Sequence, residues 1–555
     1  MTSWKVPFLL VLCLYCTAPN AYPQTSSEPL GSAERATPPS NGSPYVELDS
    51  WVYPAIERLA ALGYIHAAFD DQRPWTRIEC ASLVVEAGNN ITESSPLEVE
   101  QIYAELAAEF QAEIAGPQPF SADIESIYAK TIGISGKPLN DSYHFGQTII
   151  NNFGRPYHEG FDSYDGFSAY AIAGRFVIYT REEFQHVPSA PAYPLAVRQF
   201  IASIDENPLQ PATPLVTTDQ FRLLNTYLGV NLGGWELSFG KQSVWWAPDE
   251  GGALLFSDNA EPIYMFRASR IVPFELPWIF HRLGPVKFDA FFGKLSGNEF
   301  PPRPLIHGEK ISLKPTPNLE LGFSRTAEFS GVGRPLTFLS LFRSYTMFTS
   351  GAGEPSNQSP GKRTGGFDAS YRVPFLRDWL TVYGDSLSDD DPSPFANPPR
   401  AALSAGFYMS RLPCLRKIDF RGEAVYTDAP NGETGGHYVY FDGFYHDLYT
   451  NKGNLIGSWV GREGTGFRAW LTYWANAKNS VQFAYRHMTV SKNFIPRGES
   501  LNDGALRVNW WLADNLSISG SLQYERWFAP VLAPSPQMNW TSAVSLTFWP
   551  KLGRP

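Results

Sequence analysis

Cysteine is scarce in this chain. Of its 555 residues only four are cysteine, and two of these, Cys13 and Cys16, lie close to the N-terminus. Their spacing is that of a redox pair, but it falls within a segment that we expect to be removed on export. Only Cys80 and Cys414 would then remain, and nothing in the sequence supports a bond between them. A framework of disulfides is therefore excluded as the basis of this fold.

Charge and long apolar runs are limited as well. Charged residues make up 18% of the chain, the net charge is −11 and the mean hydropathy is −0.23. The negative charge argues against a nucleic-acid partner, because phosphate binding requires clustered lysine and arginine. The hydropathy argues against a helical membrane protein. It agrees with a membrane barrel, whose strands alternate polar and apolar residues and average near neutral.

Catalytic and metal-binding signatures are missing. The nine histidines show no ligand spacing, and there is no phosphate loop, zinc pattern or dinucleotide fingerprint. The run Gly384-Asp385-Ser386-Leu387 spells an esterase signature with Ser386 as nucleophile, but no later Asp-x-x-His supports it. The acidic run 389–391 offers carboxylates for Ca²⁺, although a solvated loop explains it more simply. We predict no catalytic residues, no metal, no cofactor and no enzyme activity.

The N-terminus of the chain carries an export signal. Lys5 supplies a positive charge, and residues 8–16 form an apolar run too short to span a bilayer. Residues 1–21 are therefore predicted to be a signal peptide. The alternative is a lipoprotein signal ending at Cys13, but Leu12 before it is bulkier than that pattern prefers.

A short helical region is expected next, after a linker. Residues 22–44 are rich in Pro, Ser and Gly and predict a mobile linker. Residues 45–117 then carry helical spacing and helix-end signals. These signals are the apolar positions Trp51, Ile56, Leu59 and Leu62 followed by Gly63, the capping-box pair Thr76 and Glu79, and a third helix that begins at Pro96. We expect this region to lie in the periplasm.

Residues 123–549 change to a period of two. In the segment 516–524, for example, apolar residues or Gly alternate with polar ones, and the segment 481–486 does the same. Repeated segments of about ten alternating residues indicate a transmembrane barrel. The last such segment ends at Phe548 and Trp549, as in terminal strands that barrel-insertion machinery recognises, and residues 550–555 extend beyond it. We therefore predict an all-β transmembrane barrel preceded by a small α-helical region.

Turn lengths orient this barrel. Bacterial barrels have short periplasmic turns and longer outer loops. Tight turns are predicted at 232–234, 376–378, 412–414, 476–479 and 513–515. All of them fall at the periplasmic end if residues 428–464 form one long outer loop rather than containing a strand. The barrel then has about eighteen antiparallel strands, an even number as expected for a single-chain bacterial barrel.

Two stretches resemble the capsule assembly Wzi family. One is Gly240-Lys241-Gln242-Ser243-Val244-Trp245-Trp246-Ala247-Pro248 with Ser257-Asp258-Asn259-Ala260-Glu261-Pro262, and the other runs from Tyr445 to Gly457 and ends Gly461-Arg462-Glu463-Gly464. The resemblance implies an outer-membrane barrel with a periplasmic helical region. It also implies a lectin-like role in holding capsular polysaccharide on the cell surface. Ala247 stands where the family pattern has Gly.

The helical region also resembles a single S-layer-homology repeat, through Arg73-Pro74-Trp75-Thr76-Arg77-Ile78-Glu79. Such repeats bind cell-wall polymers, and they usually act in sets. A plain helical plug for the barrel is the alternative explanation for the same residues.

Sugar binding requires flat aromatic faces beside groups that hydrogen-bond hydroxyls. Both family-like stretches supply this mixture, and both are expected in outer loops. The candidate polysaccharide-binding residues are Trp245, Trp246, Asp258, Asn259, Tyr445, His446, Asp447 and Arg462. The alternative is that these residues pack loops onto the barrel wall or form an interfacial aromatic girdle.

The favoured function is an outer-membrane lectin-like barrel that binds capsular or extracellular polysaccharide and supports its attachment or assembly. Its expected partners are that polysaccharide, outer-membrane lipid and the barrel-insertion machinery. A saccharide-transporting porin is the alternative, and it would keep an open lumen. An outer-membrane hydrolase would need a Ser-His-acid cluster that the sequence does not show.

The signal peptide yields a first prediction. The mature protein should begin between Ala18 and Thr25 and be found in the outer membrane, because the apolar run beside Lys5 directs export and cleavage. Intact-mass spectrometry of the membrane fraction measures this directly. A mature protein that retains Met1 would contradict the prediction.

Overall fold

The structure, a computed structural model, describes residues 41–116, 119–347, 355–374, 376, 379–389, 401–429, 439–447 and 449–550. The expected signal peptide (1–21), most of the expected linker (22–44) and nearly all of the expected extension (550–555) lie outside the described residues. The acidic run 389–391 and the turn 376–378 lie partly outside them. Among the helices of the described residues, none is both long and apolar enough to cross a membrane.

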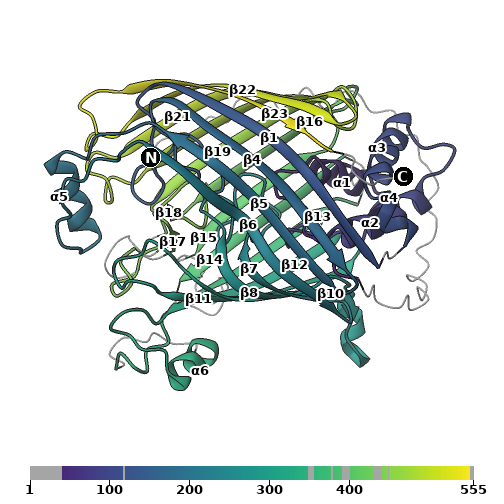
Figure 1. Ribbon diagram of the computed structural model, residues 1–555, viewed down its shortest axis with the longest axis horizontal. Helices are drawn as coiled ribbons and strands as arrows, with labels where there is room; N and C mark the ends of the chain where they lie inside the picture. Colours follow the sequence, from purple (N-terminus) through teal and green to yellow (C-terminus); the bar gives the residue numbers. More distant parts are fainter. Residues whose placement is uncertain are drawn as a thin grey trace.

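Eighteen antiparallel strands close into one barrel (Figure 1). In chain order they are β1 (Phe120–Gly136), β4 (Gly160–Ala173), β5 (Phe176–Val187), β6 (Thr218–Leu232), β7 (Trp235–Gln242), β8 (Ile263–Arg270), β10 (Pro285–Lys294), β11 (Leu305–Thr316), β12 (Leu319–Phe329), β13 (Lys362–Arg372), β14 (Thr381–Asp389), β15 (Ala402–Met409), β16 (Ile418–Tyr426), β19 (Gly464–Trp474), β20 (Ser480–Val490), β21 (Glu499–Ala513), β22 (Leu516–Phe528) and β23 (Gln537–Phe548). Closure comes from β1, which pairs with β4 on one side and with β23 on the other. The expected barrel of about eighteen strands is confirmed.

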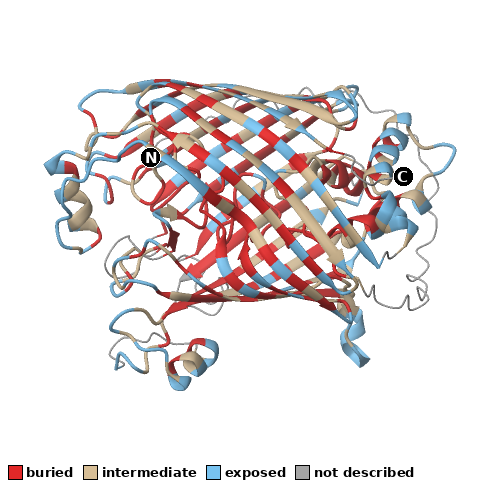
Figure 2. Cartoon of the chain, viewed as in Figure 1, coloured by how far each residue is buried: buried red, intermediate tan, exposed pale blue. Residues whose placement is uncertain are grey.

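The strands form because their side chains alternate between two environments. On β20, Phe483 and Tyr485 are exposed on the outer face, whereas Ala484 and Arg486 are buried toward the lumen. Figure 2 shows the same alternation of exposed and buried residues along many strands. An apolar exterior with a polar interior is the pattern of a barrel in a membrane.

The two ends of the barrel differ in the length of their connections. The tight turns gather at one end. Gly233 and Gly234, between β6 and β7, both have positive φ (63° and 82°), which glycine adopts without steric cost. The long connections, including 427–463 between β16 and β19, leave from the other end, which we call the outer end. The residues described within 428–463 contain no barrel strand, as the parity argument predicted, and β19 begins at Gly464.

The N-terminal residues fold into four helices. They are α1 (Val52–Ala61), α2 (Arg77–Asn90), α3 (Leu97–Glu109) and α4 (Gln111–Ala115). The expected capping box is present at the start of α2, where Thr76 and Glu79 exchange side-chain to backbone hydrogen bonds. Gly63 follows α1 with a positive φ of 86°. The helices share one apolar core and lie at the tight-turn end of the barrel (Figure 1).

This helical region is attached to the inner wall by ion pairs. Lys310 on β11 is fully buried and pairs with Asp71 of the helical region (3.3 Å) and with Asp368 of β13. Arg181 on β5 pairs with Asp49 at 2.8 Å. A buried charge is tolerated only when it is paired in this way. The helical region therefore closes the lumen at the tight-turn end.

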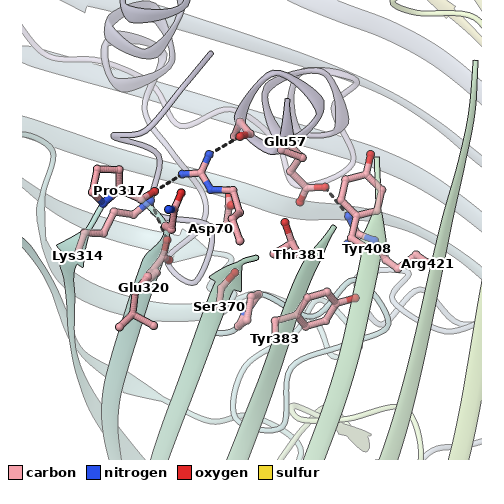
Figure 3. Close-up of a pocket in the computed structure, with 16 residues that line it drawn as sticks. Glu57, Asp70, Lys314, Pro317, Glu320, Ser370, Thr381, Tyr383, Tyr408 and Arg421 are labelled. Carbon is pink, nitrogen blue, oxygen red and sulfur yellow. Dashed lines mark hydrogen bonds and ion pairs between the residues drawn. The ribbon is translucent and has the colours of Figure 1, made fainter. Parts of the chain in front are cut away.

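The seam between the helical region and the wall contains a small cavity (Figure 3). Its volume is about 50 Å³, well below the several hundred Å³ of a typical ligand pocket. Glu57 of α1 pairs with Arg421 of β16 at 2.9 Å across it, and Arg372 donates to the carbonyl of Pro317 at 2.6 Å. The cavity is a polar seam rather than a ligand site.

The outer end is filled by its own connections. They carry the short hairpins β2 (Asn140–Asp141) with β3 (Gly146–Gln147) and β17 (Thr450–Asn451) with β18 (Asn454–Leu455), and the helix α5 (Leu195–Ile204). The largest apolar core of the described chain lies among these connections.

The last residues of the expected linker are packed rather than mobile. Ser43 and Pro44 are buried, and Gly42 N–H donates to the Gly174 carbonyl at 3.0 Å.

With both ends filled, we predict little or no steady ion conductance when the purified protein is inserted into planar lipid bilayers. Ions need a continuous aqueous path, which the packed connections and the helical region interrupt. Single-channel recording provides the measurement, and large stable ohmic channels would contradict this prediction.

The Lys310→Met variant provides a comparison. It leaves Asp71 and Asp368 buried without their cation, a loss that costs about 3–5 kcal/mol when one partner of a buried pair is removed. Transient openings should become more frequent in this variant while the barrel itself stays folded, as judged by heat-modifiable migration on gels.

Candidate functional site

The tryptophan pair of the first family-like stretch is buried inside the barrel. Trp246 lies in the connection between β7 and β8, and its Nε1 donates to Asp289 of β10 at 3.0 Å. Its ring packs against Phe256 and Phe291, with centroids 5.1 and 5.5 Å away. The backbone of Trp245 exchanges two hydrogen bonds with Arg73, both 3.0 Å long. This stretch therefore joins the wall, the outer connections and the helical region.

Asn259 and Ser257 of the same stretch contact the second stretch, whereas Asp258 contacts the connection between β1 and β4. Asn259 donates to the carbonyl of Leu455 at 3.2 Å, and Ser257 donates to that of Gly457 at 2.8 Å. The carbonyl of Asp258 accepts from Phe153 N–H at 2.7 Å. Burial raises the pKa of the Asp258 carboxyl to about 7. Both residues hold two connections together within the lumen.

Arg462 belongs to a buried cluster of charges that joins three outer connections. Its Nη1 donates to Asp205 at 2.6 Å, and its guanidinium lies over the ring of Tyr143 at 4.6 Å. His144 is 2.7 Å from Asp205 and 2.8 Å from Asp141. We call Asp141, His144, Asp205 and Arg462 the loop latch.

The pKa values of the loop latch follow from its geometry. Burial by itself lowers the pKa of His144, but the carboxylates of Asp141 and Asp205 outweigh burial and raise it to about 9. Burial raises the pKa of Asp205, and the charges of His144 and Arg462 outweigh it, so the net shift is downward. At neutral pH the cluster therefore contains two cations and a low-pKa carboxyl.

The second family-like stretch reaches the surface beside the latch. Tyr445 is buried, whereas His446 and Asp447 are partly buried. The Asp447 carboxylate accepts from the backbone N–H of Glu299, which joins this connection to the one between β10 and β11. His446 Nδ1 lies 2.7 Å from Asn207 Oδ1, so a third connection meets the other two here.

The rings of Phe300 and Phe441 contact His446, and together with Phe444, two residues before His446 in the chain, they form what we call the outer aromatic cluster. Phe300 stacks on His446 with centroids 6.4 Å apart and planes 22° apart. Phe444 is 56% exposed, and the Arg334 guanidinium lies 4.2 Å from the centre of its ring. The cluster thus presents apolar ring faces together with a cation at the outer end.

The eight residues predicted for polysaccharide binding fall into two groups. Trp245, Trp246, Asp258, Asn259, Tyr445 and Arg462 are buried, and His446 and Asp447 are partly accessible. Both stretches leave the barrel at the outer end, where outer loops were expected, and they fold back into the lumen. The binding role of the eight residues stays a prediction.

Three partners of this site were missed from the sequence. Phe300, Arg334 and Asn207 come from three other connections and carry no motif. Ser386 of the esterase-like run lies in β14, where its hydroxyl donates to the carbonyl of Phe367 at 2.9 Å. That serine is thus engaged in the barrel wall.

Comparison with known proteins gives matches to a family model, to a curated protein and to solved structures. Residues 129–541 match the family model described as capsule assembly protein Wzi. A curated Klebsiella pneumoniae protein, described as an uncharacterized 55.8 kDa protein in the cps region, is 27% identical over 176 residues, which is 31% of this chain. The match spans only about a third (34%) of the length of that relative.

Among the solved structures, one match covers nearly the whole chain. It is Wzi of Escherichia coli, described as an outer membrane protein involved in group 1 capsule assembly and as a carbohydrate-binding β-barrel. The TM-score is 0.66 and the identity 15%, with 92% of this chain and 100% of that chain covered. At this identity the likeness concerns the fold.

The loop latch predicts a pH dependence. The pKa of His144 in the folded protein, about 9, lies above its ordinary value of about 6.5. The stabilisation from its charge is therefore complete below about pH 6.5 and is lost as the pH rises through about 9. The difference corresponds to roughly 3 kcal/mol. Hydrogen exchange at residues 141–147, corrected for intrinsic rates, should show less protection at about pH 10 than at about pH 7.

The His144→Gln variant keeps a hydrogen-bonding side chain but cannot gain a positive charge. Its protection should be lower at neutral pH and should change little between these two pH values. Equal protection of the unmodified protein on both sides of about pH 9 would contradict a charged latch.

Proposed function

This chain belongs to the capsule assembly protein Wzi family, and from that premise we propose that it is a lectin-like barrel of the outer membrane. In this proposal it binds capsular or extracellular polysaccharide and supports its attachment or assembly at the cell surface. The observation that carries the proposal is the outer aromatic cluster, whose Phe444 is exposed at the outer end of a filled barrel.

The cluster offers the chemistry that a sugar chain requires. The exposed ring of Phe444 provides an apolar face for the carbon side of a pyranose. Arg334 beside it carries a fixed positive charge suited to the carboxylates of an acidic polysaccharide. His446 and Asn207 add groups that bond hydroxyls. Aromatic faces beside such donors and acceptors are what we expect of a lectin.

The cluster is held in place by the backbone beneath it. Asp442 Oδ1 accepts from the backbone N–H groups of Phe444 (2.8 Å) and Tyr445 (3.0 Å), a side-chain turn that directs Phe444 outward. Asp447 ties the same segment to Glu299. In this proposal the buried members of the family-like stretches position the exposed ones, which alone touch the sugar.

A saccharide porin is the alternative function. It would need an open lumen, whereas the described connections and the helical region fill both ends of this barrel. Outer-membrane lipid and the barrel-insertion machinery remain the other proposed partners. The helical region would face the periplasm, because the tight turns of bacterial barrels lie there. Its likeness to an S-layer-homology repeat stays a prediction.

We expect the double variant Phe444→Ala and His446→Ala to bind polysaccharide from the protein's own organism about tenfold more weakly. The loss of one stacked ring face and one hydrogen-bonding group corresponds to roughly 1.4 kcal/mol or more. The measurement is equilibrium binding of the purified barrel to the immobilised polysaccharide. Asp447 is left intact because its carboxylate holds the Glu299 backbone.

Trp278→Ala is the matched control, since Trp278 is an exposed aromatic residue (92%) between β8 and β10 at the tight-turn end, away from the cluster. It should bind like the unmodified protein. Unchanged affinity of the double variant, with a barrel that is intact on heat-modifiable gels, would move the binding site away from this cluster.

A further inference from the structure

A groove runs across the outward face of the barrel, between β5 and β11. Its volume is about 530 Å³, and its lining is mostly apolar. The outward side chains that line it are Phe176, Leu228, Val230, Leu237, Phe239, Phe266, Ala268, Ala290, Phe292 and Glu309, joined by Tyr345. Because these strands turn their apolar side chains outward, the groove lies on the face that meets the membrane.

The register of the strands explains its shape. Leu228, Phe239, Phe266 and Phe292 are successive cross-strand partners and form one row of large side chains. The adjacent row consists of Val230, Leu237, Ala268 and Ala290, which are also successive partners. Two neighbouring alanines beside a row of phenylalanines leave a trough along the wall. With strands about 4.8 Å apart, the six strands from β5 to β11 give it a length of roughly 24 Å.

One end of the trough meets a helix that lies outside the barrel. Helix α6 (Phe338–Thr346) belongs to the connection between β12 and β13 and sits beside β11 in Figure 1. Its Tyr345 stacks on His307 of β11 at 4.0 Å, and Ser344 Oγ lies 3.0 Å from the same imidazole. Arg325 of β12 donates to the Tyr345 carbonyl at 2.6 Å. These contacts fix α6 against the outer wall.

The other face of α6 is apolar and open. Phe338 and Phe342 are exposed and stack on one another, and Leu339 beside them is also exposed. A helix with exposed aromatics on one face and polar contacts on the other is the kind that lies in a membrane interface. α6 therefore marks the level of the lipid headgroups at the outer end.

Positive charge gathers at the same place. Arg325 from β12, Arg343 from α6 and Arg363 from β13 lie at this end, and Arg325 and Arg363 both donate to the carbonyl of Met347 at the end of α6. Glu309 is the acidic residue among those that line the groove. Guanidinium groups beside an apolar trough complement a lipid that carries phosphate on its headgroup and hydrocarbon below it.

We propose that this groove binds one acyl chain of a phosphorylated lipid of the outer leaflet, with its phosphate at α6 and its chain along Ala268 and Ala290. The proposal rests on the outer-membrane placement but not on polysaccharide binding. The apolar lining selects hydrocarbon, and the phenylalanine row confines it to one path. The arginines favour a headgroup whose phosphate charge is not balanced by an ammonium of its own, so the occupant differs from the zwitterionic phospholipid that merely surrounds the barrel.

The test is native mass spectrometry of the full-length barrel in detergent, titrated with bisphosphorylated lipid A or with dioleoylphosphatidylethanolamine. We expect one lipid A per barrel to be retained. The double variant Ala268→Trp and Ala290→Trp fills the trough from its floor and should lower that retention at least tenfold. Tryptophan is tolerated on a lipid-facing wall, so the barrel should still fold.

The matched control is Ala169→Trp on β4, which also faces outward, opposite Ile124 and Thr180, but lies away from the groove. It should retain lipid A like the unmodified protein. Preferential retention of phosphatidylethanolamine, equal retention of lipid A by the trough variant, or a barrel dimer without lipid would each overturn the proposal. Polysaccharide binding should be unchanged in every variant, so failure of the lipid site is distinguishable from failure of the proposed function.

Discussion

An eighteen-stranded barrel encloses more space than its own inward side chains can fill, and the rest of this structure depends on how that space is occupied. The inner wall is polar and charged, so apolar filler alone would leave buried charges unpaired. At one end the helical region neutralises charges of the wall, because Asp71 pairs with Lys310 and Asp49 pairs with Arg181. At the other end the ion pairs of the loop latch join three outer connections to one another. Ion pairs thus hold the packed segments in place at both ends of the barrel.

The packing of the lumen also determines where a ligand can bind. Trp246 is hydrogen-bonded to Asp289 and enclosed by Phe256 and Phe291, so it shapes the site without being accessible. What remains at the surface is the edge of the packed connections, where Phe444 projects beside Arg334. A large, flexible polymer suits such a site because it can bind at the rim of the barrel without entering it.

The outer face of the barrel wall is apolar, in contrast to the inner face, because it contacts lipid. A barrel of this kind usually shows a uniform apolar belt with aromatic girdles. Here Ala268 and Ala290 interrupt the belt, and α6 is fixed against the wall beside the resulting trough. The proposed polysaccharide site and the groove lie on different faces of the molecule, so the chain presents one chemistry at the outer end and another to the membrane.

The sequence by itself determined the features that depend on neighbouring residues. Alternation around Phe483 predicted strands, and the pair Thr76 and Glu79 predicted a capped helix, because period and capping are local properties. Only the tertiary structure decided which outer residues are accessible. Arg462 meets Asp205 from 257 positions away, and no local pattern records that distant partner or the burial that it brings. Phe300 and Arg334 likewise reach the candidate site only through barrel closure and the inward folding of their connections.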